Sequence, residues 1–201
     1  MTGTLSLGTE EMPAYQVVRR QRIIDAAKAL LRINDYESIQ IRDVAAEANV
    51  ALGTLYRYFS SKEHLYANVV YDWAVPFSTR PMEFDASLDT AARLGLRLRG
   101  ALISFEKNPY FYRAIFQLRT SSDPEVTTVM SKLGRVLEEP MRAEMHALSD
   151  EEAQDITVMI WALLLEVTAQ IISEDLSVAD AYRVVDRFIQ LVGHRLETAA
   201  K

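Results

Sequence analysis

Apolar residues recur along most of this chain at the three- and four-residue spacing that is typical of amphipathic helices. Two short stripes follow one another between residues 40 and 65: Ile41, Val44, Ala45 and Ala48 form the first, and Leu55 and Phe59 form the second. Asn49 lies between them and favours the left-handed conformation in which many helices end. The pattern therefore predicts two short helices joined by a tight turn.

Longer helices are predicted on both sides of this pair. Ile23, Ile24, Ala27, Leu30 and Leu31 give a helix at 15–33 its buried stripe. Further helices are predicted at 62–75, 86–107, 110–119, 124–147, 150–174 and 178–199. Residues 76–85 contain two prolines and interrupt the helical pattern, so they are predicted to separate two halves of the chain. Because no segment alternates like a strand, the predicted fold is all-α.

The second short helix has an outward face whose chemistry suits a nucleic acid. On a helical wheel, Gly53, Thr54, Arg57 and Tyr58 project away from its buried stripe. A glycine allows close approach to a duplex, and Arg57 can contact phosphate or the edge of guanine. The hydroxyls of Tyr56 and Tyr58 can reach phosphate oxygens. These features predict a helix-turn-helix whose second helix recognises DNA.

Basic residues flank this motif. The S-x-x-E spacing of Ser60 and Glu63 predicts a capping box that starts the next helix, and Lys62 in its first turn is predicted to bind phosphate. Arg19 and Arg20, near the start of the first helix, form either a solvated charged turn or a basic arm against phosphate or the minor groove.

These residues resemble the DNA-binding motif of TetR/AcrR-type transcriptional regulators. The resemblance covers residues 18–70 and rests on Arg42-Asp43-Val44-Ala45, Ala48-Asn49-Val50 and the run from Gly53 to Glu63. It implies DNA contact at Thr54, Tyr56, Tyr58 and Lys62 and at the start of the second helix, here Gln40 and Arg42. It also favours the basic arm for Arg19 and Arg20. A narrower resemblance, in Val-Ala-x-Gly-Thr-Leu-Tyr-Arg-Tyr-Phe, is to actinobacterial regulators of steroid catabolism.

The sequence departs from the family pattern at two places. Relatives commonly have Ser or Thr where this chain has Gln40, and Ser-Lys where it has Ala51-Leu52. The wheel groups Leu52 with Leu55 and Phe59, which fits an apolar staple at least as well as a base contact. Ala51 and Leu52 are still counted among the predicted DNA-binding residues. If Leu52 instead faces DNA, it would contact a thymine methyl group.

The charge of the chain is distributed unevenly. The whole chain carries −6, but residues 15–70 hold eight Lys/Arg and six Asp/Glu, a balance of +2. Since DNA binding depends on local phosphate contacts, this regional balance permits it. It is a modest charge, so a monomer is expected to bind DNA weakly.

The amino-acid composition narrows the class of protein to which this chain can belong. A 49% apolar and 25% charged chain is typical of soluble proteins, and the lack of Cys and of a signal peptide fits the cytoplasm. His64, His146 and His194 are far apart and no nucleophile motif is present, so an enzyme, a metal site or a cofactor is not expected.

The C-terminal helices are predicted to pair subunits. The apolar run from Met159 to Leu165 is too short, and too close to Asp155 and Glu166, to span a membrane. The last helix carries a stripe, with a glycine for close approach, whose predicted interface members are Val184, Val185, Phe188, Val192 and Gly193. The stripe fits the core of one domain, or a four-helix interface between two subunits, which the resemblance implies.

The same half is expected to bind a small apolar or amphipathic effector. Aromatic residues are numerous there, and the predicted ligand residues are Phe105, Tyr112, Arg113, Phe116, Trp161 and Glu166. Glu166 interrupts an apolar helix, and Arg113 could pair with it or with an acidic ligand. A steroid or an acyl-CoA is one hypothesis for the effector.

Together these features predict a disordered arm at 1–14, a helix-turn-helix domain at 15–61 and a ligand-binding and dimerisation domain at 62–201. The predicted function is a repressor that binds a double-stranded, near-palindromic operator as a homodimer and is released by its effector. An activator with the same fold and a helical adaptor that binds protein remain alternatives.

Overall fold

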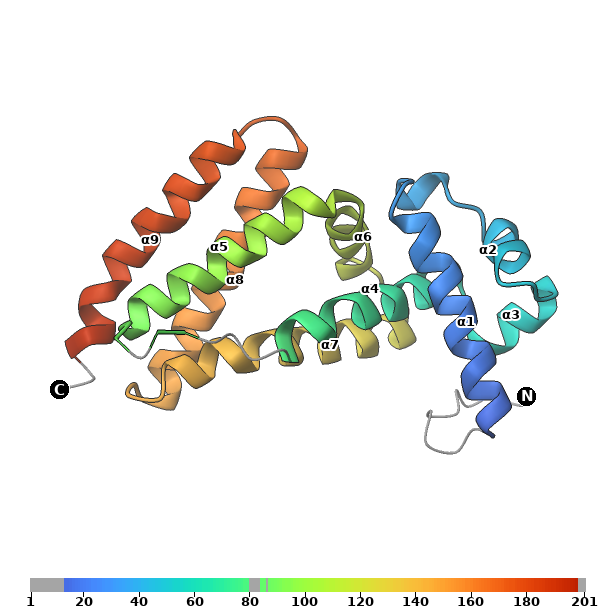
Figure 1. The fold of residues 1–201 in the computed structure, drawn as a ribbon, viewed down its shortest axis with the longest axis horizontal. Coiled ribbons are helices and arrows are strands. Elements are labelled where there is room, and N and C mark those ends of the chain that lie inside the picture. Colours follow the sequence, from blue (N-terminus) through green and yellow to red (C-terminus); the bar gives the residue numbers. More distant parts are fainter. Residues whose placement is uncertain (1–12, 80–83, 86, 199–201) are drawn as a thin grey trace. The chain divides into compact units, whose positions relative to one another are not determined.

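The computed structural model describes residues 13–79, 84–85 and 87–198 of the chain. Its helices are α1 (Ala14–Leu31), the 3-10 helix η2 (Tyr36–Ser38), α2 (Ile41–Glu47), α3 (Leu52–Tyr58), α4 (Lys62–Thr79), α5 (Thr90–Lys107), α6 (Pro109–Arg119), α7 (Pro124–Glu144), α8 (Asp150–Ile172) and α9 (Val178–Thr198) (Figure 1). No strand occurs in these ranges, which confirms the all-α fold. The predicted disordered arm lies outside the described residues except for its last two positions.

The chain divides into two compact units. The first unit comprises Met1–Ala74 and Arg113–Lys132, and the second comprises Val75–Tyr112 and Leu133–Lys201. The first unit therefore extends beyond the boundary predicted after residue 61. Much of α4 belongs to it because Leu65, Tyr66, Val69 and Val70 are fully buried.

The core of the first unit joins the predicted stripes. Side chains from α1, α2 and α3 meet in it and have at most a few per cent of their surface exposed; they include Ile23, Ile24, Ala27, Leu31, Val44, Ala45, Leu55 and Phe59. Asn49 ends α2 with a φ of 50°, which confirms the predicted left-handed position. Helix α2 thus packs against α1, and α3 packs against α2.

Two local predictions about α4 are wrong. Ser61 caps the helix, because its Oγ accepts the His64 N–H at 2.9 Å, whereas Ser60 Oγ contacts His64 Nδ1 and Glu125. The predicted capping box, Ser60 with Glu63, is therefore displaced by contacts to α7. In addition, α4 continues past Pro76 to Thr79. Pro76 is exposed, so water can satisfy the carbonyl that the missing proline N–H leaves free.

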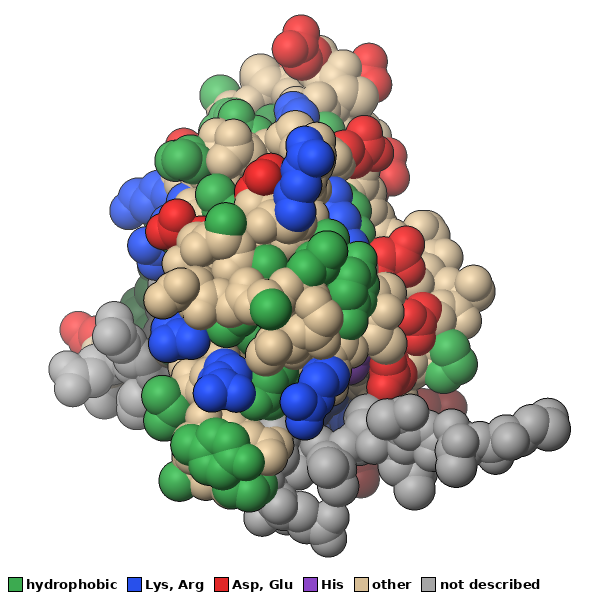
Figure 2. Space-filling model, turned by 90° about the vertical axis from the view of Figure 1, so that its right-hand side faces the viewer, with side chains coloured by type: hydrophobic (Ala, Val, Ile, Leu, Met, Phe, Trp, Pro, Cys, Tyr) green, Lys and Arg blue, Asp and Glu red, His purple; other side chains and the backbone are tan. Residues whose placement is uncertain are grey.

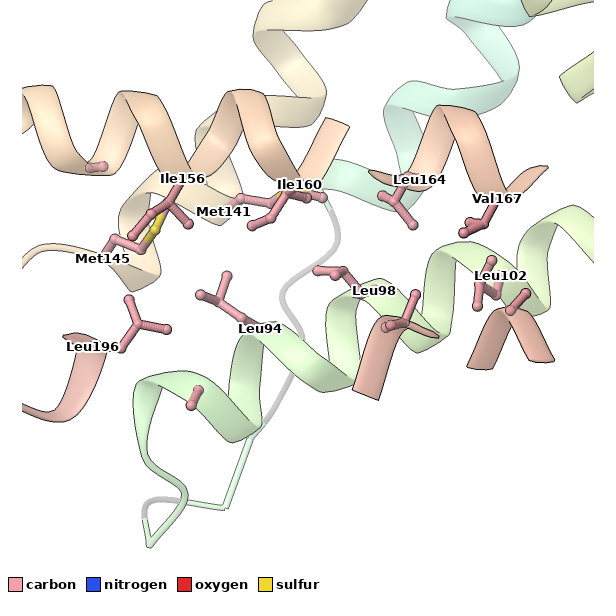
Figure 3. Close-up of a cluster of buried hydrophobic side chains, with 14 residues drawn as sticks. Leu94, Leu98, Leu102, Met141, Met145, Ile156, Ile160, Leu164, Val167 and Leu196 are labelled. Carbon is pink, nitrogen blue, oxygen red and sulfur yellow. The ribbon is translucent and has the colours of Figure 1, made fainter. Parts of the chain in front are cut away.

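The second unit has its core between α5, α7, α8 and α9. Leu94, Leu98 and Leu102 of α5 point toward Ile156, Ile160, Leu164 and Val167 of α8, with Met141 of α7, Met145 just after α7 and Leu196 of α9 beside them (Figure 3). At Gly193, an added Cβ would lie 3.5 Å from the Ala91 side chain, so α9 approaches α5 closely there. The predicted capping box of Ser149 and Glu152 is confirmed at the start of α8.

Helix α8 is unusually apolar for a partly exposed helix. By length and composition alone it could cross a membrane. Core helices of soluble proteins can have the same length and composition, so this feature does not indicate a membrane span. A third of its apolar window is buried inside the protein. Its exposed side includes Val158 and Met159, at 57% and 50% exposure. This side leaves apolar surface available for another partner.

Candidate nucleic-acid interface

Helix α3 presents one buried and one exposed face. Leu55 is fully buried and fixes the helix on the core, while Gly53, Tyr56 and Arg57 are exposed. An added Cβ at Gly53 would meet nothing within 4 Å, so the backbone of α3 is open to solvent at this point. Thr54 is partly buried, and so is Tyr58. The exposed face carries a guanidinium and a phenol, which can donate hydrogen bonds to phosphates or bases.

Leu52 lies on the exposed side, so the interpretation of this residue as an apolar staple is wrong. It is the first residue of α3 and its exposure is 42%, whereas Leu55 and Phe59 are fully buried. Ala51, the N-cap residue of α3, is also exposed. The space beneath the helix is filled by residues further along it, which leaves Leu52 outside the core.

Arg20 is partly buried and contacts other side chains of the first unit. Its guanidinium donates a hydrogen bond to Asn68 Oδ1 at 2.5 Å and lies 5.0 Å from the centroid of the Phe59 ring. Burial lowers the pKa of Arg20 below its ordinary value, although the Asp72 carboxylate opposes this shift. Arg19 is exposed beside the Tyr15 ring. Of the two predicted arm residues, Arg19 is therefore the exposed one, and Arg20 makes contacts within the first unit.

Lys62 is held at the start of α4 by η2. Its Nζ lies 4.4 Å from the centroid of the Tyr36 ring and 3.4 Å from the Glu37 carbonyl oxygen. Partial burial lowers the pKa of Lys62, while the carboxylates of Glu37 and Asp35 act in the opposite direction.

Gln40 and Arg42 are exposed at the start of α2. Figure 2, viewed from the side on which α3 lies in Figure 1, shows Lys and Arg side chains spread among exposed apolar groups.

The corner between α6 and α7 belongs to the first unit and binds its loops. Gln117 donates to Glu37 at 2.7 Å, and Arg113 pairs with Asp35 at 3.2 Å. Ser121 donates to Glu63 at 2.8 Å. The sequence analysis missed these contacts, because the partners lie about 60 to 80 positions apart and share no motif. They tie the loop before α2 and the start of α4 to a distant part of the chain.

His64 forms a second contact between α4 and this corner. Its Nδ1 lies 3.2 Å from Glu125 Oε2 and accepts the Ser60 N–H at 3.3 Å. Burial lowers the pKa of His64, and the Arg20 charge acts in the same direction. Glu125 and Asp123 favour the charged imidazolium and oppose this shift.

The predicted ligand residues are divided between the two units. Phe105 is in the core of the second unit, where the Tyr112 ring packs edge-on against it and the Tyr112 hydroxyl donates to the Ala101 carbonyl. Glu166 is exposed and accepts from Gln170 at 2.6 Å. Arg113 and the partly buried Phe116 belong to the first unit. Within its own unit, Arg113 pairs with Asp35 at 3.2 Å.

Trp161 has a buried polar group that no described residue satisfies. It packs against the core of the second unit, and its Nε1–H is buried without a hydrogen-bond partner among the residues that the structure describes.

A shallow open groove of about 410 Å³ lies between α5 and α9, lined by Ala91, Gly95, Leu96, Arg99, Asp186 and Ile189 among others. None of the predicted ligand residues lines this groove. In the described ranges, no three His, Asp or Glu side chains gather into a possible metal site.

The predicted dimer residues on α9 fall into two groups. Val185 is fully buried in the core of its own unit, and Gly193 is also buried. Val184, Phe188 and Val192 are partly buried against that core and keep some exposed surface. Of the predicted interface residues, this second group keeps surface that a partner could cover, and Leu191 beside it is exposed.

Residues 23–69 match the family described as bacterial regulatory proteins, tetR family. The HTH-type transcriptional repressor KstR of Mycolicibacterium smegmatis is 31% identical over 162 residues, which cover 76% of this chain and 74% of that protein. KstR of Rhodococcus jostii is 27% identical over 81% of this chain and 75% of that protein. The chain belongs to the TetR family and is a DNA-binding transcriptional regulator.

Solved structures share the fold. A TetR transcriptional regulator from Rhodococcus sp. RHA1 matches with a TM-score of 0.73 at 23% identity, over 88% of this chain and 96% of that chain. The regulator FadR from Bacillus subtilis, solved in complex with stearoyl-CoA, matches with a TM-score of 0.65 at 20% identity, over 86% of this chain and 96% of that chain. This chain therefore shares its fold with these two solved structures.

Proposed function

We propose that this regulator is a repressor that binds a near-palindromic operator as a homodimer in the cytoplasm and that a small molecule releases it. The observation that carries the proposal is the outward face of α3, where Tyr56 and Arg57 are exposed beside the open backbone of Gly53. In a helix-turn-helix, the second helix enters the major groove. Repression is supported by the similar KstR proteins, which are named repressors.

Dimerisation supplies the affinity that one subunit lacks. Residues 15–70 carry a balance of only +2, so a single subunit would neutralise few phosphates. Two recognition helices about one DNA turn apart contact two half-sites at once. The exposed apolar residues of α8 and α9, Val158, Met159 and Leu191, support an interface built from these two helices.

The effector is proposed to be bulky and largely apolar, such as a steroid or an acyl-CoA. The buried, unpartnered Nε1–H of Trp161 supports a ligand that carries a hydrogen-bond acceptor, because a buried donor without a partner is costly. FadR, which shares the fold, was solved with stearoyl-CoA. The resemblance of the DNA motif to regulators of steroid catabolism supports the steroid.

Release is proposed to act through the contacts of α4 and the α6–α7 corner. Arg113, Gln117 and Ser121 hold the loops of the first unit, so a shift of α6 or α7 on ligand binding would move α4 and α3 with it. The effector must bind the released state more tightly than the DNA-bound state, by about 1–3 kcal/mol for typical couplings. When the distance between the two recognition helices no longer matches the distance between the half-sites, the dimer can bind only one half-site at a time.

Selection of bound sequences from random DNA at two salt concentrations tests the proposal. We expect a near-palindromic motif whose affinity falls as salt rises, because phosphate contacts release counterions. A reporter behind the selected operator rises with effector for a repressor and falls for an activator. Weak binding without sequence preference, in protein freed of bound small molecules, would contradict an operator-binding function.

A double variant tests the site. Tyr56→Phe with Lys62→Ala removes two groups proposed to contact phosphates and should weaken operator binding by about 100-fold or more, since hydrogen bonds to charged groups contribute about 1.5–3 kcal/mol each. Tyr110→Phe with Lys107→Ala makes the same chemical changes in the second unit and should leave affinity unchanged. Equal affinity of all three proteins would refute the assignment of Tyr56 and Lys62.

A further inference from the structure

Leu52 is an exposed leucine at the position where a recognition helix meets bases. A single exposed leucine is ordinary on a protein surface, so its exposure alone indicates nothing. Its location is informative, because the N-terminal residues of a recognition helix contact base edges in the major groove. Leu52 is the first residue of α3, and 42% of it is exposed. The core beneath α3 is filled by Leu55 and Phe59 and does not need it.

The neighbours of Leu52 make this part of α3 apolar and open. Ala51 before it is exposed, and Gly53 after it has no atom within 4 Å of the position that a Cβ would occupy. Neither side chain offers a hydrogen-bond donor or acceptor. Arg42 and Arg57, on α2 and α3, are exposed and can bind phosphate. The proposed DNA-contacting surface of α2 and α3 therefore has polar groups that can bind the DNA backbone and an apolar group at the start of α3.

We propose that Leu52 contacts the C5-methyl group of a thymine at one fixed position in each operator half-site and thereby determines sequence specificity there. This inference rests on the proposed operator binding. Thymine presents an apolar C5-methyl group in the major groove beside its O4 acceptor, whereas cytosine, adenine and guanine present hydrogen-bonding groups and no methyl. A leucine side chain cannot satisfy those groups, so it favours thymine both by contact and by exclusion.

The size of the effect follows from the removal of one methyl group from water. Burial of a methylene-sized group contributes about 0.8 kcal/mol, which corresponds to about a four-fold change in affinity for each half-site. A dimer that contacts both half-sites should show about a fifteen-fold change when both methyl groups are absent. This change is small beside the loss expected from removal of phosphate contacts, and it is confined to one position.

Deoxyuridine provides the probe, because it pairs as thymine does but lacks the methyl group. The operator obtained by selection is substituted with deoxyuridine at each thymine position in turn, in both half-sites, and the dissociation constant is measured. We expect one thymine position at which the unmodified protein loses about fifteen-fold in affinity. The Leu52→Ala variant should bind the two DNAs equally, and selection with this variant should no longer return a fixed thymine.

Two control variants make the result specific. Leu52→Met keeps an apolar side chain of similar volume and should retain the deoxyuridine sensitivity. Ile33→Ala removes another exposed aliphatic side chain of the first unit, outside the helix-turn-helix, and should retain it as well. Because Leu52 lies outside the core, Leu52→Ala should keep the thermal midpoint and the salt dependence of the unmodified protein.

The outcomes separate this inference from the function on which it rests. Sequence-specific binding without any deoxyuridine-sensitive position, or with a sensitivity that persists in Leu52→Ala, overturns the role of Leu52 and leaves operator binding intact. Binding without sequence preference overturns the proposed operator function, and the role of Leu52 with it. A loss that disappears only in Leu52→Ala supports the inference.

Discussion

Tyr66 has a buried hydroxyl group without a hydrogen-bond partner among the described residues of the chain. Its side chain is fully buried, and its ring packs edge-on against Tyr36 with 5.2 Å between centroids. Burial raises the pKa of the Tyr66 hydroxyl well above its ordinary value. Since an unsatisfied buried polar group costs about 1–3 kcal/mol, we expect Tyr66→Phe to raise the free energy of unfolding by about 1 kcal/mol in urea denaturation.

Tyr112→Phe provides the matched contrast. The Tyr112 hydroxyl donates to the Ala101 carbonyl at 3.1 Å, so its removal should lower the free energy of unfolding by about 1 kcal/mol. A loss of stability in Tyr66→Phe as well would show that the Tyr66 hydroxyl has a partner in solution, such as an ordered water molecule.

Leu52 shows what a helical wheel can and cannot predict for one residue. The wheel grouped it correctly by angle with Leu55 and Phe59, but angle alone does not say how far along the helix the core extends. Helix α3 has seven residues, and the core lies under its middle and end. The roles of Leu55 and Phe59 were therefore predictable from spacing, whereas the exposure of Leu52 depends on how far the packed core extends along α3.

At the scale of elements, His64 connects α4 to residues of three other segments. It faces Glu125 of α7 and Asp123 before it, Arg20 of α1, and Ser60 in the turn after α3. Because burial lowers the pKa of His64 below the value of about 6.5 that it has in the unfolded chain, the folded protein favours the neutral imidazole. Its contribution to stability is present above about pH 6.5 and is lost as the pH falls toward the lowered pKa.

The urea midpoint is therefore expected to be lower at pH 5.5 than at pH 7.5, and His64→Asn should reduce this difference. Asparagine keeps an acceptor near the position of Nδ1 but does not titrate. The control is His146→Asn, which replaces an exposed histidine and should preserve the full difference. Hydrogen bonds lower the carboxyl pKa values of Asp85, Glu152 and Asp180. These groups lose their contributions to stability only below the compared pH range, from about 5.5 to 7.5. An unchanged pH dependence in His64→Asn would contradict the role of His64.

The helices themselves were predictable because their signals are local. Apolar spacing located the described α-helices but not the short η2, and Ser149 with Glu152 correctly located the start of α8. The start of α4 was not predictable in the same way. Ser60 has the right spacing for a cap, but its hydroxyl contacts Glu125, which lies 65 positions away. A long-range contact of this kind leaves no periodic pattern in the sequence.

At the scale of the whole molecule, the fold and the class of function predicted from the sequence are confirmed, whereas the effector site stays a prediction. The DNA motif is a dense run of residues with distinct chemistry, from Gly53 to Lys62, so a single sequence is enough to recognise it. An effector site uses the same apolar residue types as a core. Phe105 and Trp161 look alike in sequence, yet one fills the core and the other has a buried, unpartnered N–H group.

The subunit interface proposed for α8 can be tested by a charge. Val158 and Met159 are exposed although their helix is apolar, and burial of such side chains against a second subunit would remove them from water. We expect Met159→Glu to raise the dimer dissociation constant by about 100-fold, because an unpaired carboxylate is costly in an apolar interface. Sedimentation would show monomers, and operator affinity would fall with the loss of the second half-site.

Ile103→Glu is the matched control for this interface. Ile103 is 44% exposed on α5, so the same charge placed there should leave the dimer and its operator affinity unchanged. A dimer that survives Met159→Glu would move the interface away from this face of α8. If dimers form through α8 and α9, operator binding and dimerisation should weaken together in Met159→Glu, because the two recognition helices reach both half-sites only while the subunits are joined.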